Sequence, residues 1–145
     1  MQMENYAGLA AAIRAMPIAR HIGLEIGGFG AGTTELHLPF RKELSHDGAA
    51  FQAGALATLA DFAGVAAINT LVEDGRFAVS AGLVIEFLAP ARGEMLLAVA
   101  EVAATRGRRG TARTDIYAMN QGQRVLCATA IVRGHIVRDP GDAGA

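Results

Sequence analysis

The longest apolar stretch of the chain contains a single carboxylate. It runs from Phe51 to Leu71, FQAGALATLADFAGVAAINTL, and Asp61 stands at its middle. Apolar residues fall on every side of a helical wheel drawn through this stretch, which is typical of a helix in a protein interior. An ionised carboxylate there is costly unless it is hydrogen-bonded, paired or hydrated, so Asp61 is a candidate catalytic acid or base. The alternative is an aspartate on the one solvated stripe of an ordinary helix.

A polar loop, RKELSHDGAA at residues 41–50, directly precedes this helix. Backbone N–H groups at a helix N-terminus lack partners within the helix and can receive an anion or a polarised carbonyl. This loop, which contains His46, is therefore a candidate part of a functional site.

Length and composition indicate one domain and limit its partners. The chain has 145 residues, with 13 Lys and Arg against 14 Asp and Glu, and this balance argues against a nucleic-acid partner. The 52% share of hydrophobic residues hints at self-association. The apolar stretch at residues 51–71 is rich in Ala and Gly, has Asp61 at its centre and lacks basic flanks, so it is not expected to span a membrane.

The single cysteine, Cys127, excludes an internal disulfide and fits a reducing compartment. Its strand-like surroundings, VLCATAIV, indicate a small buried hydrophobe rather than a reactive thiol. The N-terminal MQMENYAG lacks the basic and apolar regions of a secretory signal, so we expect a cytoplasmic location. No metal site is predicted, because the remaining histidines have no ligand spacing with Asp, Glu or Cys: His21, His37 and His135.

The first third of the chain predicts a helix and a strand pair. Helical spacing of Ala and Leu indicates a short N-terminal helix from Gln2 to Met16, ended by Pro17, and residues 17–23 are expected to form a link. Alternation of apolar and polar residues in 24–40 predicts two strands around a glycine turn. GGFGAG at residues 27–32 has the wrong glycine spacing for a dinucleotide-binding fingerprint, so it is interpreted as that hairpin turn.

After the apolar helix the period of the pattern changes from 3.6 to two residues. Four strands are predicted at residues 78–88, 94–105, 110–119 and 124–137, separated by turns at 90–93, 106–110 and 120–123, and consecutive strands are expected to pair antiparallel. The sum is an α+β fold in which a sheet of five to six strands curls around one long central helix. Residues 1–137 are expected to form this single domain, with a disordered tail at 138–145.

Two segments, QAGALATLADFAGVAA and VSAGLVIEFLAPARGE, resemble the hotdog-fold acyl-CoA thioesterases of the PaaI-like group. The similarity runs from about Pro17 to Val137 and implies the hotdog fold. In that family a His-Gly-Gly triplet opens the central helix, and an acidic residue follows about two turns later. Here the triplet reads Gln52-Ala53-Gly54 and the acid is Asp61. Ala53 replaces the glycine whose N–H polarises the thioester carbonyl; a backbone donor survives this change, although a methyl group now crowds the approach.

The resemblance also implies roles for side chains. Asp61 would be the general base or the nucleophile, and the N–H groups of Ala53 and Gly54 would form the oxyanion hole. His46 falls on a loop position that often carries Asn in the family, which implies that it positions a water or bonds the carbonyl region; the alternative is a solvated loop histidine. Ser80 falls on a Ser or Thr that helps to hold the attacking water in some members; the alternative is a strand hydroxyl bonded to backbone.

Coenzyme A, as part of the substrate, is the only cofactor-like group that the resemblance implies. The positions matching its binding residues in the family are Phe87, Pro90, Ala91, Arg92, Arg106, Gly107, Arg108 and Arg109. Guanidinium groups in RGRRG suit bidentate binding of phosphates. The alternative for RGRRG is a solvated basic hairpin turn.

The spacing along the helix has a consequence for assembly. Asp61 lies eight residues after Ala53, so the two are about 12 Å apart along the helix axis. One thioester carbon cannot reach both within a subunit, which predicts a homodimer or homotetramer that hydrolyses acyl-CoA between subunits. Two alternatives stay open: a hotdog-fold hydroxyacyl thioester dehydratase or hydratase using His46 and Asp61, and a noncatalytic acyl-CoA-binding protein.

Overall fold

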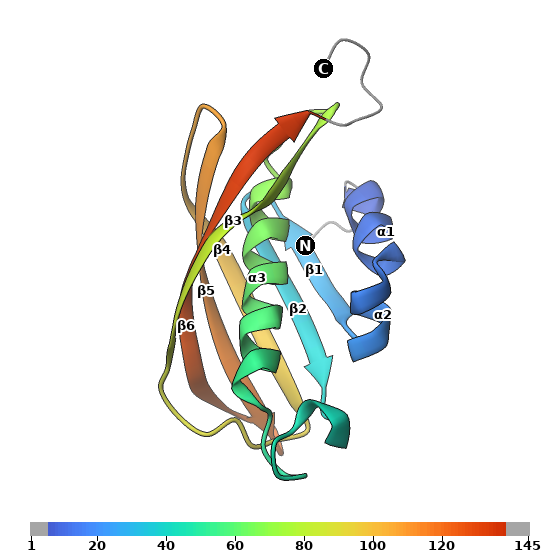
Figure 1. The fold of residues 1–145 in the computed structure, drawn as a ribbon, viewed down its shortest axis with the longest axis vertical. Coiled ribbons are helices and arrows are strands. Elements are labelled where there is room, and N and C mark those ends of the chain that lie inside the picture. The colour runs from blue at the N-terminus through green and yellow to red at the C-terminus, as the bar shows by residue number, and fades with distance from the viewer. Residues whose placement is uncertain (1–5, 139–145) are drawn as a thin grey trace.

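The computed structural model describes residues 6–138. One antiparallel sheet of six strands curls around helix α3 (Ala53–Asn69), as Figure 1 shows. The strand order is β1-β2-β4-β5-β6-β3. The strands are β1 (Glu25–Gly30), β2 (Thr33–Pro39), β3 (Arg76–Phe87), β4 (Met95–Arg106), β5 (Arg109–Asn120) and β6 (Gln123–Arg138). The predicted α+β architecture is therefore confirmed, with six strands around one long helix.

Helix α3 lies against the concave face of the sheet through small residues. Its buried positions recur at helical spacing, and they are Leu56, Leu59, Ala60, Ala63, Gly64, Ala66, Ala67 and Ile68. A Cβ at Gly64 would stand 2.5 Å from the Cβ of Val132 on β6, so only glycine permits this approach. The Thr114 hydroxyl of β5 donates to the Ala60 carbonyl at 3.4 Å. This packing fixes the orientation of the whole helix relative to the sheet.

The N-terminal region contains two helices instead of one helix and a link. Helix α1 (Ala7–Ala15) is followed at once by α2 (Pro17–Ile22); the start predicted at Gln2 lies outside the described residues. The prediction of a link at 17–23 was wrong because Pro17 occupies the first position of α2, where its missing N–H and fixed φ are tolerated. Both helices lie beside β1 on the same side of the sheet as α3 (Figure 1).

The glycine-rich segment is mostly strand. Three of its glycines belong to β1, and the hairpin turn is formed by residues 31 and 32, where Gly32 has a φ of +75°. The prediction of a hairpin is confirmed, but the turn is shorter than the whole GGFGAG segment.

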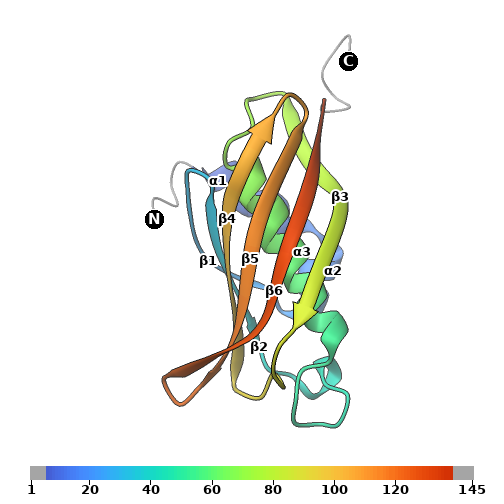
Figure 2. The same ribbon diagram turned by 90° about the vertical axis from the view of Figure 1, so that its left-hand side faces the viewer.

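Strand β3 does not pair with β4, contrary to the expectation for consecutive strands. It pairs with β6, while β4 lies between β2 and β5. The chain between β3 and β4 crosses below the start of α3, where the Phe51 N–H donates to the Ala91 carbonyl at 2.9 Å. Figure 2 shows β3 at one edge of the sheet. The short PARG segment could not reveal this crossing, because the same residues also fit a tight turn.

Two further predictions concern the C-terminal tail and the capacity of the chain to span a membrane. Arg138 is the last residue of β6, and the rest of the predicted tail, 139–145, lies outside the described residues. No helix within residues 6–138 has the length and apolar character that a membrane crossing requires.

Candidate functional site

The structure brings Asp61 and Ser80 together. The Ser80 hydroxyl on β3 donates to Asp61 Oδ1 at 2.7 Å. Ser80 stands beside a bulge, since the pairing of β3 with β6 shifts register between Ser80 and Gly82. Both residues line a shallow hollow of about 400 Å³ between α3 and β3, together with Ala57 and Thr58. A predicted catalytic pair from two distant segments thus shares one site.

Asp61 is only partly buried in a single subunit. The expectation of a helix enclosed on all sides was wrong for one face of α3, where Gly54 is exposed and Thr58 and Asp61 are partly exposed. Sheet packing occupies the opposite face of the helix. A helix that is apolar on all sides can thus bury one face in the core of its own subunit and leave another face for a partner or a ligand.

The N-terminus of α3 presents one open backbone donor. Gln52 is the N-cap, and its side-chain oxygen accepts from the Gly54 N–H at 2.5 Å. The Ala53 N–H, first in the helix, has no acceptor within residues 6–138. Of the two predicted oxyanion donors, Ala53 is thus accessible and Gly54 is occupied by a neutral carboxamide.

A hollow of about 460 Å³ lies beside this helix terminus. It gathers seven of the residues predicted for catalysis or for CoA: His46, Gln52, Ala53, Phe87, Pro90, Ala91 and Arg92. The loop before α3 and the crossing between β3 and β4 provide its two sides, and Leu56 and Phe51 provide apolar surface. The hollow therefore joins an apolar wall, one cation and an open N–H group.

Asp47 organises this loop, and the sequence analysis missed it. Its Oδ1 accepts from the N–H groups of Ala49 and Ala50 at 2.8 Å each, and these bonds lower the pKa of Asp47 from its ordinary value. Its Oδ2 lies 3.6 Å from His46 Nε2 and 3.7 Å from Arg92 Nη2. Asp followed by Gly is a turn signal, and it was available in SHDG.

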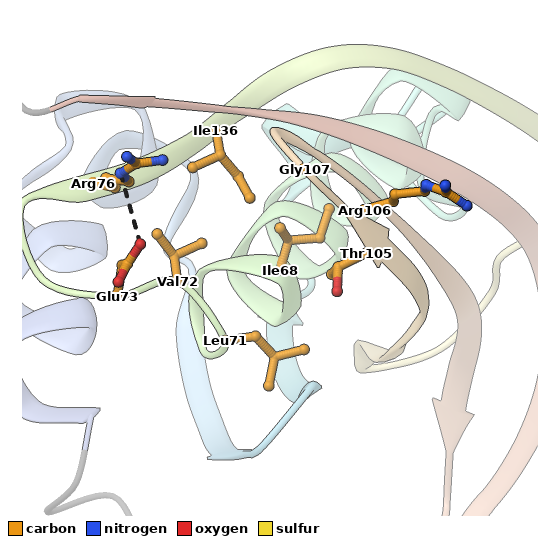
Figure 3. Close-up of a pocket in the computed structure, with 9 residues that line it drawn as sticks. All are labelled: Ile68, Leu71, Val72, Glu73, Arg76, Thr105, Arg106, Gly107 and Ile136. Atoms are coloured by element: carbon orange, nitrogen blue, oxygen red, sulfur yellow. Dashed lines mark ion pairs between the residues drawn. The ribbon is translucent and has the colours of Figure 1, made fainter.

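The basic turn lies at the opposite end of the same subunit. Gly107 and Arg108 connect β4 to β5, whereas the Ala53 N–H lies at the other end of the sheet. Strand β4 has 12 residues, which corresponds to about 40 Å. Figure 3 shows Arg106 and Gly107 around a hollow at the C-terminal end of α3. Within one subunit the two halves of the predicted CoA site, at 87–92 and at 106–109, do not meet.

Two other chemistries find no support in the geometry. Cys127 is buried, and burial raises the pKa of its thiol, as expected for a structural cysteine and not for a nucleophile. Within the described part of the chain, no three His, Cys, Asp or Glu side chains are grouped so that they could hold a metal ion.

Comparisons with known proteins agree with this fold. A family model described as the thioesterase superfamily matches residues 53–127, from the first residue of α3 into β6. A search of curated protein sequences gave no match.

Solved structures share the whole fold. A thioesterase family protein from Silicibacter pomeroyi superposes with a TM-score of 0.89 at 24% identity, covering 93% of this chain and 99% of that one. The PaaI protein of the Escherichia coli phenylacetic acid degradation operon gives 0.80 at 24% identity, with coverages of 93% and 94%. A Bacillus halodurans protein, solved with CoA, gives 0.74 at 23% identity, with coverages of 93% and 85%.

Proposed function

Since this chain belongs to the thioesterase superfamily and has the PaaI-like hotdog fold, we propose that it hydrolyses acyl-CoA thioesters to the free acid and CoA. One observation carries the proposal. Asp61 receives a hydrogen bond from Ser80 on the uncovered face of α3, and Ala53, the first residue of that helix, lines a hollow of about 460 Å³ and has an N–H without an acceptor in the described chain. A carboxylate that acts as base or nucleophile, together with an oxyanion donor, is sufficient for hydrolysis of a thioester.

The proposed reaction uses Asp61 as the general base or as the nucleophile. As a base, it removes a proton from a water that attacks the thioester carbonyl carbon; as a nucleophile, it attacks that carbon itself and water then cleaves the mixed anhydride. Ser80 donates to Oδ1 and so orients the carboxylate, which leaves Oδ2 to act on the water or the substrate. The Ala53 N–H and the positive end of the helix stabilise the oxyanion, and CoA leaves as the thiolate, which then takes a proton.

The site is proposed to combine two subunits. Asp61 and the Ala53 N–H of one chain are about 12 Å apart along α3, too far to act on one carbon. Strand β3 is an edge of the sheet and exposes large apolar side chains, with Val84 60% and Phe87 48% exposed. Pairing of β3 with the β3 of a second copy about a twofold axis covers this edge and brings each helix N-terminus towards the partner's helix.

The same pairing explains the divided CoA site. Phe87 ends β3 beside the helix N-terminus, whereas Arg76 begins it near the turn between β4 and β5. In an antiparallel pair of β3 strands, the end of one lies next to the start of the other. The partner's basic turn, residues 106–109, thereby approaches the hollow that holds Arg92, and both can bind phosphates of one CoA.

The test is release of CoA thiol from a panel of aliphatic and aromatic acyl-CoAs by the wild type and by Asp61→Asn. We expect kcat to fall by about 10²- to 10⁴-fold in the variant, the usual range for a general base. Asp115→Asn is the matched control, because Asp115 also accepts from a hydroxyl at 2.7 Å but lies on the sheet face away from α3. Wild-type rates in Asp61→Asn would exclude the mechanism. Hydration of an enoyl-CoA without thiol release would favour a dehydratase, and tight acyl-CoA binding without turnover a binding protein.

A further inference from the structure

Two oppositely charged side chains at the open edge of the sheet have no ionic partner within one subunit. Arg133 on β6 and Glu86 on β3 are both exposed, and neither forms an ion pair within residues 6–138. On the basis of the subunit pairing in the proposed function, we propose that Arg133 of each subunit binds Glu86 of the partner subunit. These two ion pairs fix the register in which the β3 strands of two copies pair.

Both side chains lie on the sheet face away from α3. Val132, the neighbour of Arg133, packs against Gly64 of α3, so Arg133 points to the opposite face. Arg133 is paired directly with Gly82 of β3, and Glu86, four residues further along β3, shares that face. Four residues of a strand correspond to about 13 Å. The two charges are therefore too far apart to meet within one subunit.

The guanidinium of Arg133 lies directly over the edge strand. A Cβ added at Gly82 would stand 2.2 Å from Arg133 Nη2 and 2.8 Å from its Cζ. A side chain at this position would push the guanidinium away, whereas glycine lets it extend across β3. Strand β3 is the last strand of the sheet (Figure 2). The positive charge is thus carried to the open edge, about 4.8 Å from where a further strand would pair.

A twofold axis between the Val84 residues of two copies makes this edge complementary to itself. In an antiparallel pair related by such an axis, residues equally far before and after Val84 lie opposite each other. Gly82 then faces Glu86 of the partner subunit. Directly opposite residues have Cβ positions about 4.5–5.5 Å apart, so the carboxylate of the partner's Glu86 reaches the guanidinium that lies over Gly82. The axis repeats this contact, which gives two equivalent ion pairs.

Apolar side chains occupy the centre of the same edge. Val84 is 60% exposed, and Ile131, its direct neighbour on β6, is 44% exposed. The pairing places the two Val84 side chains opposite each other with an Ile131 on either side, so a row of four apolar side chains crosses the axis. An ion pair flanks this row on each side. An apolar centre with a charged rim is typical of protein interfaces.

The same register joins the two halves of the proposed active site. Phe87 lines the hollow beside the first residue of α3, and Ala81 lines the hollow that contains Asp61. They stand three residues after and three residues before Val84, so Phe87 of one subunit lies opposite Ala81 of the partner subunit. Moving the axis by one residue along β3 would place Glu86 opposite an uncharged residue and would lose both ion pairs.

The experiment uses complementary charge reversals. Arg133→Glu brings two carboxylates together at each contact and Glu86→Arg brings two guanidinium groups together, so homodimers of either variant should be weakened. A hybrid dimer with one subunit of each variant has opposite charges at both contacts. After exchange of equal amounts, we expect the hybrid to rise from the random half to about nine-tenths of all dimers at low ionic strength, and less at high salt. Anion-exchange chromatography separates the three species, because their net charges differ.

Two further variants test whether the effect is specific. The double variant Arg133→Glu/Glu86→Arg restores opposite charges at both contacts, so its homodimer should dissociate like the wild type in sedimentation. Glu25→Arg is the matched control, because it makes the same exchange at an exposed position of β1, the other edge of the sheet. Mixed with Arg133→Glu, it should give the random half of hybrids. Circular dichroism verifies that each variant is folded.

The outcomes separate this contact from the hydrolysis itself. A random half of hybrids from the two charge reversals would overturn the ion pair, as would a double variant that dissociates like the single ones or a monomeric wild type. None of these measurements requires a thioester to be cleaved. Enriched hybrids of a chain that releases no thiol would support the contact and refute the proposed function, whereas thiol release with random hybrids would do the reverse.

Discussion

The N–H group of Ala53 can be removed with little disturbance of the backbone. Gln52, the preceding residue, has φ −74° and ψ 147°, the extended conformation that a residue before proline prefers. Ala53 is the first residue of α3, the helix position that tolerates proline best. Its N–H has no acceptor within residues 6–138, so Ala53→Pro breaks no hydrogen bond of the described chain. We therefore expect this variant to fold, and to gain about 0.4–1 kcal/mol of stability from a restricted unfolded chain.

Activity should respond in the opposite direction. If the Ala53 N–H binds the oxyanion, its removal should lower kcat by about 10²- to 10³-fold, as for other single oxyanion donors. The Gly54 N–H cannot replace it without releasing the side chain of Gln52, which holds it at 2.5 Å. Ala53→Gly is the positional control, since it retains the N–H and removes only the methyl group, and it should stay close to the wild type.

The assay is steady-state thiol release, combined with the Kd of CoA and with urea unfolding. Lower kcat, an unchanged Kd and equal or higher stability are the expected combination. Subunit mixing adds a second test of the same N–H group. After random exchange of Ala53→Pro with Asp61→Asn subunits, half of the dimers are hybrids with one intact site each, so about a quarter of the wild-type activity should return. Wild-type kcat in Ala53→Pro would refute the role of this amide, and no recovery on mixing would refute the shared site.

Three further predictions concern the support of the site. Ser80→Ala removes the hydroxyl that donates to Asp61 at 2.7 Å, and kcat should fall about tenfold while the Kd of CoA is unchanged. Gly64→Ala would place a methyl group 2.5 Å from a valine side chain, so urea unfolding should show a loss of about 1–3 kcal/mol, whereas Gly8→Ala, with nothing within 4 Å, should not destabilise. Hydrogen bonds from the backbone N–H groups of Ala50 and Ala49 lower the pKa of Asp47 from its ordinary value of 3.8. The ionised carboxylate therefore stabilises the folded state above this value, and this stabilisation is lost as pH falls through the lower folded-state pKa. In Asp47→Asn, urea unfolding should lack this contribution to the acid dependence of stability.

The sequence predicted the elements and the central helix because their signals are local. Period-two alternation in β5, where Ala112, Thr114 and Ile116 are buried, is visible without any partner strand. The pairing of β3 with β6 was not visible in the sequence. Strand order depends on which edge of the sheet a strand joins after the connecting chain has crossed, and the pattern within one strand does not contain this information. Helix α2 was missed because Pro17 was interpreted as a stop, although proline also begins helices.

The side chains of the candidate site were predicted more fully than its hydrogen bonds. Asp61 and Ser80 were proposed separately, and Ser80 Oγ lies 2.7 Å from Asp61 Oδ1. The predicted residues Phe87, Pro90, Ala91 and Arg92 line one hollow together with Gln52. The capping of Gly54 by Gln52 could not be predicted, because it depends on a rotamer and not on residue type. The remote position of the turn at 106–109 follows from the length of β4, which the pattern did predict. The proposed role of this turn in binding CoA, however, depends on a second subunit.

The replacement of the family's His-Gly by Gln52-Ala53 is consistent with a site that uses main-chain chemistry. The carboxamide of Gln52 stabilises the helix terminus by accepting from Gly54, a role that needs no charge and no titratable group. In the proposed mechanism Ala53 acts through its N–H, which alanine and glycine share. The exchange therefore preserves the backbone donor and alters the space around it in the hollow that Gln52 and Ala53 line. If the proposed hydrolysis is correct, this chain should differ from its relatives in the acyl groups that it accepts and not in the type of reaction.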